Sequence, residues 1–180
     1  MKCKCKELQP LYDAAEQAGA CEGGLAWLSE QDNPDCMVST DAVLFGYMSW
    51  VYKNLPDMLE HITPTSEQYE RGLNDKDWSV RRIWPWRSDI TPTPEQYERG
   101  LTDKEWCVRF AWAKRSDITP TKEQYERGLT DADWYVRLEW AKRSDITPAP
   151  EQYEMGLNDK ERVVRLEWER RTDIKKARVK

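Results

Sequence analysis

Four cysteines near the N-terminus are the residues in this chain best suited to chemistry: Cys3, Cys5, Cys21 and Cys36. Four thiolates can hold a tetrahedral metal ion or an iron–sulfur cluster. However, gaps of 15 and 14 residues follow the first pair, whereas metal knuckles separate paired ligands by about two to four residues. The spacing therefore favours free thiols, and a metal or iron–sulfur protein is kept as an alternative.

No catalytic constellation is visible elsewhere in the sequence. The one histidine, His61, stands before an Ile-Thr-Pro segment and suggests a linker or capping role. Asp75 and Asp77 are separated by one residue, but the surrounding sequence lacks the glycine and closing glutamate of a calcium loop. Because no glycine-rich phosphate loop is present either, we expect a non-enzymatic protein without a cofactor.

The rest of the chain is organised by a 28-residue sequence written four times, starting at Ile62, Ile90, Ile118 and Ile146. A period of this length is typical of solenoids, in which each unit buries its apolar face on its neighbours. We therefore divide the chain into an N-terminal cap region (1–61) with the four cysteines, a repeat array (62–173) and a basic tail (174–180).

Each copy encodes two helices, with positions counted from its isoleucine. Thr at position 4 and Gln at position 7, as in Thr93 and Gln96, predict a capping box. Gly at position 11 is expected to end this short first helix as a C-cap. The second helix is expected to start near position 13, with Thr102 and Glu105 as a capping pair, and to continue to about position 26.

The predicted core uses large aromatic residues. It consists of Tyr at position 8, Leu at position 12, Val at position 19 and Trp at position 23, with Trp at position 17 joining in the first three copies. The position 23 residues are Trp84, Trp112, Trp140 and Trp168. Tryptophan and tyrosine bury a large area and keep a polar group, which suits a thin core close to water.

The pattern D-x-x-W-x-V-R-x-x-W-A-x-R-x-D-x-T-P resembles the leucine-rich-repeat-variant group of HEAT-like α-solenoids. The resemblance implies an all-α, right-handed solenoid of four helical pairs with a helical N-terminal cap. It also implies a ladder between Arg at position 20 (Arg81, Arg109, Arg137, Arg165) and Asp at position 14. Some members of the group carry an N-terminal iron–sulfur cluster, and related HEAT-like folds grip nucleic-acid phosphates.

Charge and hydropathy narrow the possible partners and location. The net charge is −5, and residues 1–61 hold ten acidic and four basic groups. The longest apolar run, residues 42–52, is too short to span a membrane, and the start lacks the apolar region of a signal peptide. A cytoplasmic protein without a membrane partner is therefore expected. The oligomeric state cannot be read from the sequence.

Differences between the copies predict a binding face. Fifteen of the 28 positions are identical in all four copies, and we assign these to the fold. Positions 15, 18, 22 and 25 vary and share one side of the second helix, here called the variable face. We expect a protein partner to bind this face, at Ser79, Ile83, Trp86, Cys107, Lys114, Tyr135, Glu139 and Lys142.

The sequence therefore predicts a protein-interaction scaffold, of which an inhibitor or adaptor of a nucleic-acid enzyme is one concrete form. Nucleic-acid backbone binding is an alternative, because position 26 supplies a row of arginines: Arg87, Arg115, Arg143 and Arg171. Against it, acidic groups match the positive charge of each copy, whereas backbone binders carry a basic excess.

Overall fold

A computed structural model describes residues 3–32, 46–55, 64–87 and 89–171 of the chain. The described residues form helices and connecting turns, without a strand. The chain divides into two compact units, Met1–Asp89 and Ile90–Lys180, which are treated separately below. His61 and Cys36 lie outside the described residues.

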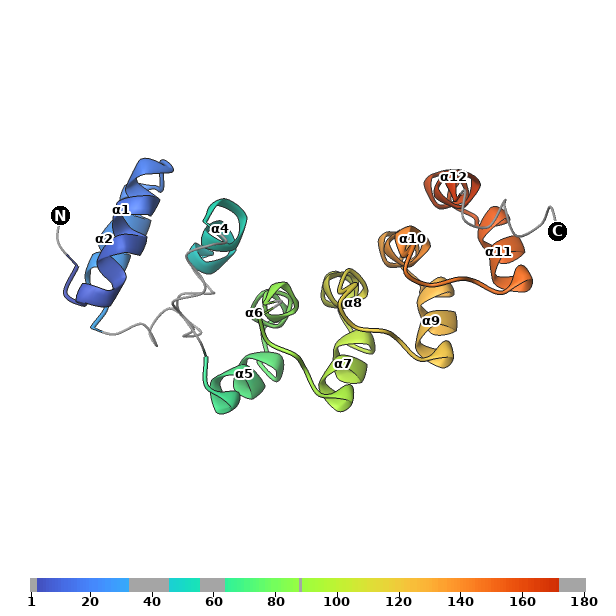
Figure 1. The fold of residues 1–180 in the computed structure, drawn as a ribbon, viewed down its shortest axis with the longest axis horizontal. Coiled ribbons are helices and arrows are strands. Elements are labelled where there is room, and N and C mark those ends of the chain that lie inside the picture. The colour runs from blue at the N-terminus through green and yellow to red at the C-terminus, as the bar shows by residue number, and fades with distance from the viewer. Residues whose placement is uncertain (1–2, 33–45, 56–63, 88, 172–180) are drawn as a thin grey trace. The chain divides into compact units, whose positions relative to one another are not determined.

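Among the described residues, the first unit holds three helices of the cap region and the first repeat copy (Figure 1). The cap helices are α1 (Gln9–Gln17), α2 (Glu22–Ser29) and α4 (Tyr47–Asn54), and a 3₁₀ turn, Lys6–Leu8, precedes them. The first copy supplies α5 (Ser66–Leu73), α6 (Trp78–Arg81) and a 3₁₀ turn, Trp84–Trp86. Pro85 stands inside that turn, which accounts for the early end of α6 because proline cannot donate to the helical ladder.

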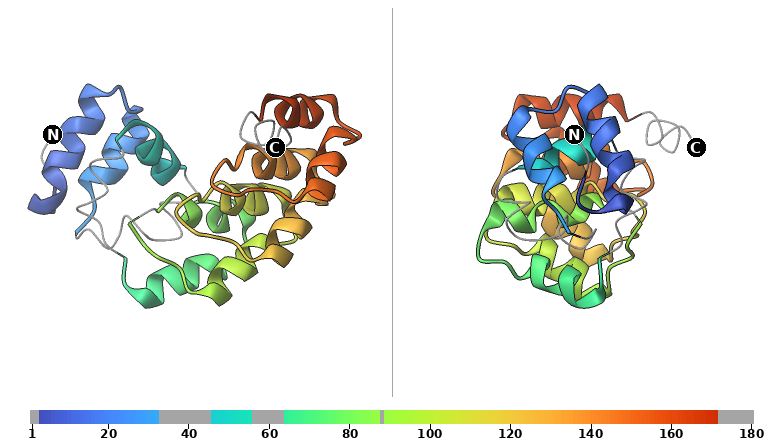
Figure 2. Two further views of the ribbon diagram at one scale, coloured as in Figure 1. Left: turned by 45° about the vertical axis from the view of Figure 1, so that its right-hand side comes forward. Right: turned by 90° about the vertical axis from the view of Figure 1, so that its left-hand side faces the viewer.

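The second unit consists of three successive helical pairs. They are α7 (Pro94–Leu101) with α8 (Trp106–Ala113), α9 (Lys122–Leu129) with α10 (Trp134–Lys142), and α11 (Pro150–Leu157) with α12 (Arg162–Arg170). In this unit α8, α10 and α12 form one row and α7, α9 and α11 form the other (Figure 1). Figure 2 shows the same succession of pairs from two other sides. The expected helical pairs are therefore present.

The first helices begin as the sequence predicts. In the second copy the Thr93 side chain accepts a hydrogen bond from the Gln96 amide, and the Gln96 side chain accepts one from the Thr93 amide. The first and third copies contain the same capping box. The fourth copy has Ala149 at the cap, so it retains only the bond that Gln152 accepts from the Ala149 amide.

The second helices begin later than predicted, at position 17 instead of position 13. The position 14 aspartate accepts a hydrogen bond from the amide of position 16, as Asp131 does from Asp133 at 2.9 Å. This tight turn holds the segment outside the helix, and Asp133 becomes the N-cap by accepting from the Tyr135 amide. The predicted pairing of Thr102 with Glu105 is wrong, because the Thr102 hydroxyl donates back to the Glu98 carbonyl of α7.

The repeated glycine is not the predicted C-cap. Gly72, Gly100, Gly128 and Gly156 lie inside the first helices, one residue before the last. A Cβ atom added to Gly128 would stand 2.2 Å from Nε1 of the Trp140 indole, and the other copies are equally close. The glycine is therefore required because the indole of the same copy lies directly on the helix backbone.

The position 23 tryptophans form the core with the tyrosine of the same copy. Trp84, Trp112, Trp140 and Trp168 are at most 3% exposed. Each indole meets the position 8 tyrosine edge-on, with ring centroids 5.8 Å apart for Tyr125 and Trp140. The prediction for these positions is confirmed, and the valine at position 19 is also buried in every copy.

The second cap helix contains two successive glycines. It begins at Glu22 and includes Gly23 and Gly24. Both glycines face Tyr47 of α4, whose ring atoms lie 3.4 Å from a Cβ placed on Gly24. The pair therefore allows close contact between two helices inside the first unit.

The contact between glycine and tryptophan predicts two destabilised variants. Trp140→Ala should lower the free energy of unfolding by about 3–5 kcal/mol, because it empties a buried site. Gly128→Ala should cost about 1–3 kcal/mol through overpacking, although alanine favours helices. Denaturant titration measures both. A Gly128→Ala variant as stable as the wild type would contradict the close contact, and adding Trp140→Phe should partly rescue it.

The incomplete cap of the fourth copy predicts a stabilising change. Ala149→Thr should restore the capping box and raise the free energy of unfolding by about 1 kcal/mol. Thr121→Ala in the third copy is the matched control and should lower it by a similar amount. A thermal melt in which Ala149→Thr is neutral while Thr121→Ala destabilises would show that the fourth copy cannot use the cap.

Candidate partner-binding surface

Exposed aromatic side chains gather at the N-terminal ends of α8 and α10. Trp106 is 41% exposed and Tyr135 is 43% exposed. Their rings stack with centroids 5.2 Å apart and planes 19° from parallel. Trp134 stacks on Tyr135 with centroids 3.6 Å apart. These three residues are called the aromatic cluster below.

The start of the second helix positions the aromatic cluster. The turn at Asp131 and the cap at Asp133 fix where α10 begins, so Trp134 and Tyr135 are its first two residues. The next residue, Val136, is 1% exposed and anchors the helix in the core. Positions 17 and 18 therefore project from the helix end, while positions 19 and 23 face inward.

The cluster corrects the sequence analysis at position 17, which was assigned to the core. Trp78 is 41% exposed, as is Trp106, and Trp134 is half-buried. The guanidinium of Arg82 lies 5.4 Å from the centroid of the Trp78 ring. A sequence signal was available, because the fourth copy replaces this tryptophan by Arg162 and no copy replaces position 23.

The variable face is only partly exposed. Trp86 is 47% exposed and Tyr135 is also exposed, as predicted, but Ile83 and Glu139 are 5% and 8% exposed. Ile83 is buried because the chain leaves the α-helix after Arg81, so helical spacing no longer applies. Glu139 is buried because neighbouring second helices contact each other, and burial extends around α10 beyond Trp140.

The other residues predicted to bind a partner occupy intermediate or exposed places. Ser79 and Cys107 are half-buried, and Lys114 and Lys142 are exposed. The Lys142 ammonium lies 3.1 Å from the Glu139 carboxylate. Ser79, Ile83 and Trp86 belong to the first unit, whereas the remaining members belong to the second. Within the second unit, Cys107 lies on α8 and Lys114 directly follows that helix, while Tyr135, Glu139 and Lys142 lie on α10, which contacts α8.

The predicted arginine–aspartate ladder is present in the second unit. Arg109 donates from Nε and Nη2 to both carboxylate oxygens of Asp131 in the next copy, at 2.7 and 2.8 Å. Arg137 makes the same bidentate contact with Asp159. The Nη1 group of Arg109 also donates to the Asp103 carbonyl of its own copy. These side chains therefore join adjacent copies.

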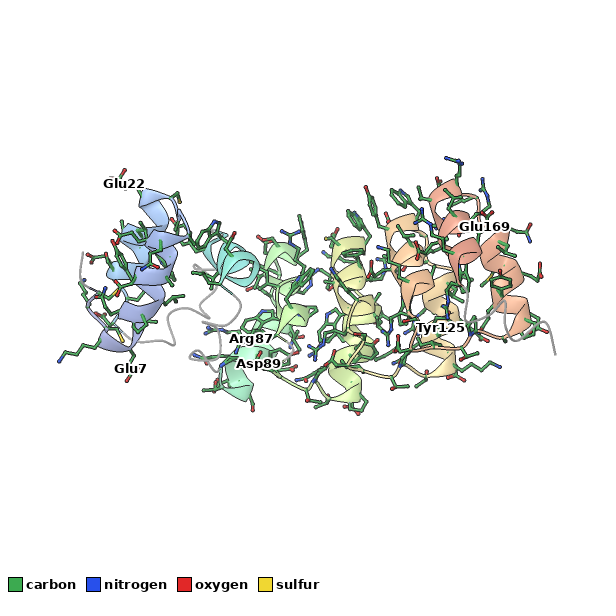
Figure 3. All side chains as sticks on the ribbon, turned by 45° about the horizontal axis from the view of Figure 1, so that its top comes forward. Glu7, Glu22, Arg87, Asp89, Tyr125 and Glu169 are labelled. Atoms are coloured by element: carbon green, nitrogen blue, oxygen red, sulfur yellow. The ribbon has the colours of Figure 1, made fainter. Side chains whose placement is uncertain are left out.

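The position 26 arginines do not form the exposed row that phosphate binding requires. Arg143 is 4% exposed; it donates to the Ala113 and Arg115 carbonyls of the preceding copy and to the Ile118 carbonyl. It also pairs with Asp145 at 2.7 Å. Figure 3 shows the equivalent Arg87 and Asp89 side by side. The remaining members of the row, Arg115 and Arg171, are also buried.

The N-terminal cysteines show no metal-site geometry in the part of the chain that is described. There, no three His, Cys, Asp or Glu side chains are grouped so that they could hold a metal ion. Cys3 is half-buried and Cys5 is buried. Burial, with a smaller contribution from the Asp13 charge, raises the pKa of the Cys3 thiol. A raised pKa disfavours the thiolate that a metal ligand or nucleophile needs.

No protein-family model, curated protein or solved structure matches the chain. The likeness to HEAT-like repeats therefore stands on the repeat residues and on the helical pairs. Among the described helices, none has both the length and the apolar character that crossing a bilayer demands.

The buried arginines predict a pH dependence. The hydrogen bond from Arg143 lowers the pKa of the Asp145 carboxyl. Because the pKa is lowered by folding, the pair contributes its full stability at any pH above the pKa of aspartate in the unfolded chain, about 3.9. This contribution is lost as the pH falls through the lower pKa of the folded state. Asp145→Asn should therefore be less stable at neutral pH and lose less stability below about pH 4.

Denaturant titrations at several pH values measure this effect. Asp117→Asn is a second variant of the same kind, because Arg115 lowers the pKa of that carboxyl in the same way. Parallel pH profiles for the wild type and both variants would contradict the assignment.

Proposed function

We propose that this chain is a non-enzymatic scaffold that binds a protein partner through the second helices of a right-handed α-solenoid. The aromatic cluster of Trp106, Trp134 and Tyr135 carries the proposal. Large aromatic side chains are enriched at binding hot spots. Trp106 and Tyr135 are exposed and Trp134 is half-buried, although the core is already built by positions 8, 12, 19 and 23.

The division between fixed and variable positions supports this proposal. The invariant side chains at positions 8, 19 and 23 are buried in every copy, so they serve packing. Position 18 changes from Cys107 to Tyr135 to Val163 within the second unit, and the latter two are exposed. Variation on exposed apolar positions is expected where a surface is adapted to one partner.

A protein partner is favoured over nucleic acid by the geometry of the cluster. Single-stranded nucleic acids bind by stacking bases on free aromatic faces beside a basic groove. Here the Tyr135 ring stacks on both Trp106 and Trp134, so part of the aromatic surface is already covered within the cluster. The arginines at position 26 are internal. An inhibitor or adaptor of a nucleic-acid enzyme, acting in the cytoplasm, is one concrete form of such a scaffold.

Affinity measurements with a partner captured from native lysate test the proposal. Trp106→Ala and Tyr135→Ala should each weaken binding by about 2 kcal/mol or more while changing the free energy of unfolding by less than about 1 kcal/mol. In the first unit, Trp86→Ala tests whether that unit contributes to the same interface.

Lys122→Ala is the matched control, because Lys122 is exposed on α9, in the row of first helices. Its affinity should equal that of the wild type. Unchanged binding by Trp106→Ala and Tyr135→Ala would overturn the proposal. Tight, salt-sensitive binding of a single-stranded oligothymidylate that both variants abolish would establish nucleic-acid binding instead.

A further inference from the structure

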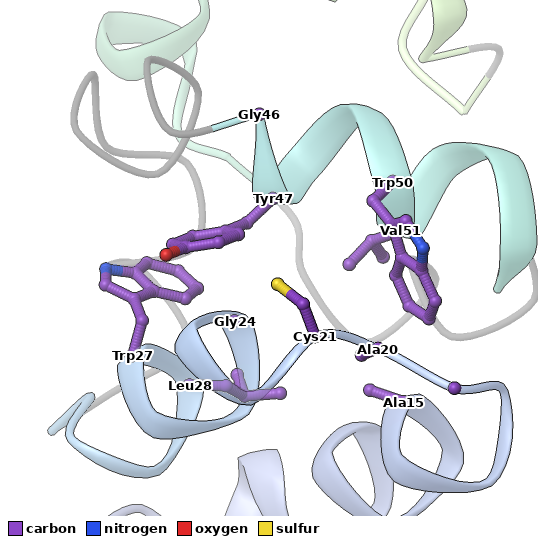
Figure 4. A pocket seen from close by; sticks show the side chains of 11 residues that line it. Ala15, Ala20, Cys21, Gly24, Trp27, Leu28, Gly46, Tyr47, Trp50 and Val51 are labelled. Carbon is purple, nitrogen blue, oxygen red and sulfur yellow. The ribbon is translucent and has the colours of Figure 1, made fainter.

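The first unit contains a cavity of about 320 Å³ between α1, α2 and α4 (Figure 4). Three aromatic side chains line it, Trp27, Tyr47 and Trp50, together with the aliphatic Leu28 and Val51. The Cys21 thiol points into the space between Tyr47 and Val51 in Figure 4. All of its described lining residues belong to the cap region.

Gly24 of α2 lines this cavity without a side chain. A Cβ on Gly24 would lie 3.4 Å from the Tyr47 ring and 3.5 Å from Sγ of Cys21. Glycine inside a helix is less favourable than alanine, yet α2 includes it here. A side chain larger than alanine at this position would occupy the space beside Tyr47 and Cys21, so glycine keeps that space open.

The lining selects the charge of a ligand. Among the described residues, no charged side chain lines the cavity. A charged group that moved from water into this lining would lose part of its hydration without gaining a partner of opposite charge, which is unfavourable. A neutral, largely apolar ligand avoids this penalty and gains from contact with the aromatic walls.

The volume selects the size of a ligand. In another protein, an apolar cavity of about 150 Å³ binds one benzene ring. The present cavity has about 320 Å³, which is enough for two fused rings. Small-molecule sites in proteins begin at about this volume.

The arrangement of the rings disfavours a quaternary ammonium ligand. Such cations bind inside cages of aromatic faces. Here the Trp27 and Tyr47 rings contact each other, with centroids 5.1 Å apart and planes at 33°. Two of the three aromatic faces are therefore partly covered, and a flat ligand that extends toward Trp50 fits better.

We propose that this cavity is a binding site for a small, neutral, two-ring aromatic molecule. The site is separate from the aromatic cluster of the second unit, so it does not depend on the proposed partner binding. Such a ligand would contact Trp27, Tyr47 and Trp50 and would cover the Cys21 thiol.

Alkylation of the thiol tests the proposal with indole as the probe. The full chain is treated with limiting N-ethylmaleimide, and peptide mass spectrometry follows modification at Cys21 and Cys107 in the same sample. Saturating indole should slow Cys21 modification at least about tenfold, because Cys21 lines the cavity. Cys107 lies in the second unit and provides the internal control, so its rate should not change.

Two further sets of measurements test which kind of ligand the cavity accepts and whether the ligand binds inside it. Indole carboxylate and choline, at the same concentration, should protect Cys21 much less than indole does. Ala20→Leu, which adds a side chain to the cavity lining from the loop between α1 and α2, should remove the protection by indole. Val51→Phe is a second filling variant, and circular dichroism shows that each variant is folded.

Alkylation of the wild-type protein is sufficient to contradict the proposal, even if both variants fail to fold. Equal rates of Cys21 alkylation with and without saturating indole would exclude the site, and stronger protection by choline would assign it to cations. Protection of Cys21 that persists in both folded filling variants would show that indole binds elsewhere.

Discussion

The contact between an indole and a glycine of the same copy is the interaction on which the repeated helical pairs depend. The Trp140 ring lies so close to α9 that any side chain at Gly128 would overlap it. This contact sets the distance between the two helices of a pair, and the edge of Tyr125 then completes the same small core. Arginines at positions 20 and 26 then join adjacent copies, as Arg109 does with Asp131 and Arg143 with the Arg115 carbonyl.

The sequence predicted the elements well because their signals are local. Capping boxes such as Thr93 with Gln96 require four consecutive residues and no tertiary information. The 28-residue period similarly identified Trp140 as a core residue. The resemblance to HEAT-like repeats implied the pairing of arginines such as Arg109 with an aspartate of a neighbouring copy. These features repeat, so each copy tests the interpretation of the others.

Features that depend on tertiary contacts could not be predicted in this way. Gly128 matched a C-cap, and only the position of an indole twelve residues later shows its real role. Trp106 looked like a core residue by composition, although the late helix start places it at an exposed end. Glu139 is buried by a neighbouring helix, which helical periodicity within one copy does not contain. Of the predicted variable face, Trp86 and Tyr135 are exposed whereas Ile83 and Glu139 are buried, and partner binding at this face stays a prediction.

The proposed function follows from the aromatic side chains that remain exposed after the helices have packed. The invariant side chains pack within and between copies. The position 26 arginines donate hydrogen bonds to backbone carbonyls and aspartates. Trp106 and Tyr135 of the aromatic cluster are exposed, as are Trp78, Trp86 and Val163. Hydroxyl-radical footprinting of the partner complex tests this most directly, because it reads side-chain exposure. A partner should protect Trp106, Trp134 and Tyr135 from oxidation while Met155, exposed on α11, stays reactive; protection of Met155 with an unprotected cluster would contradict the account.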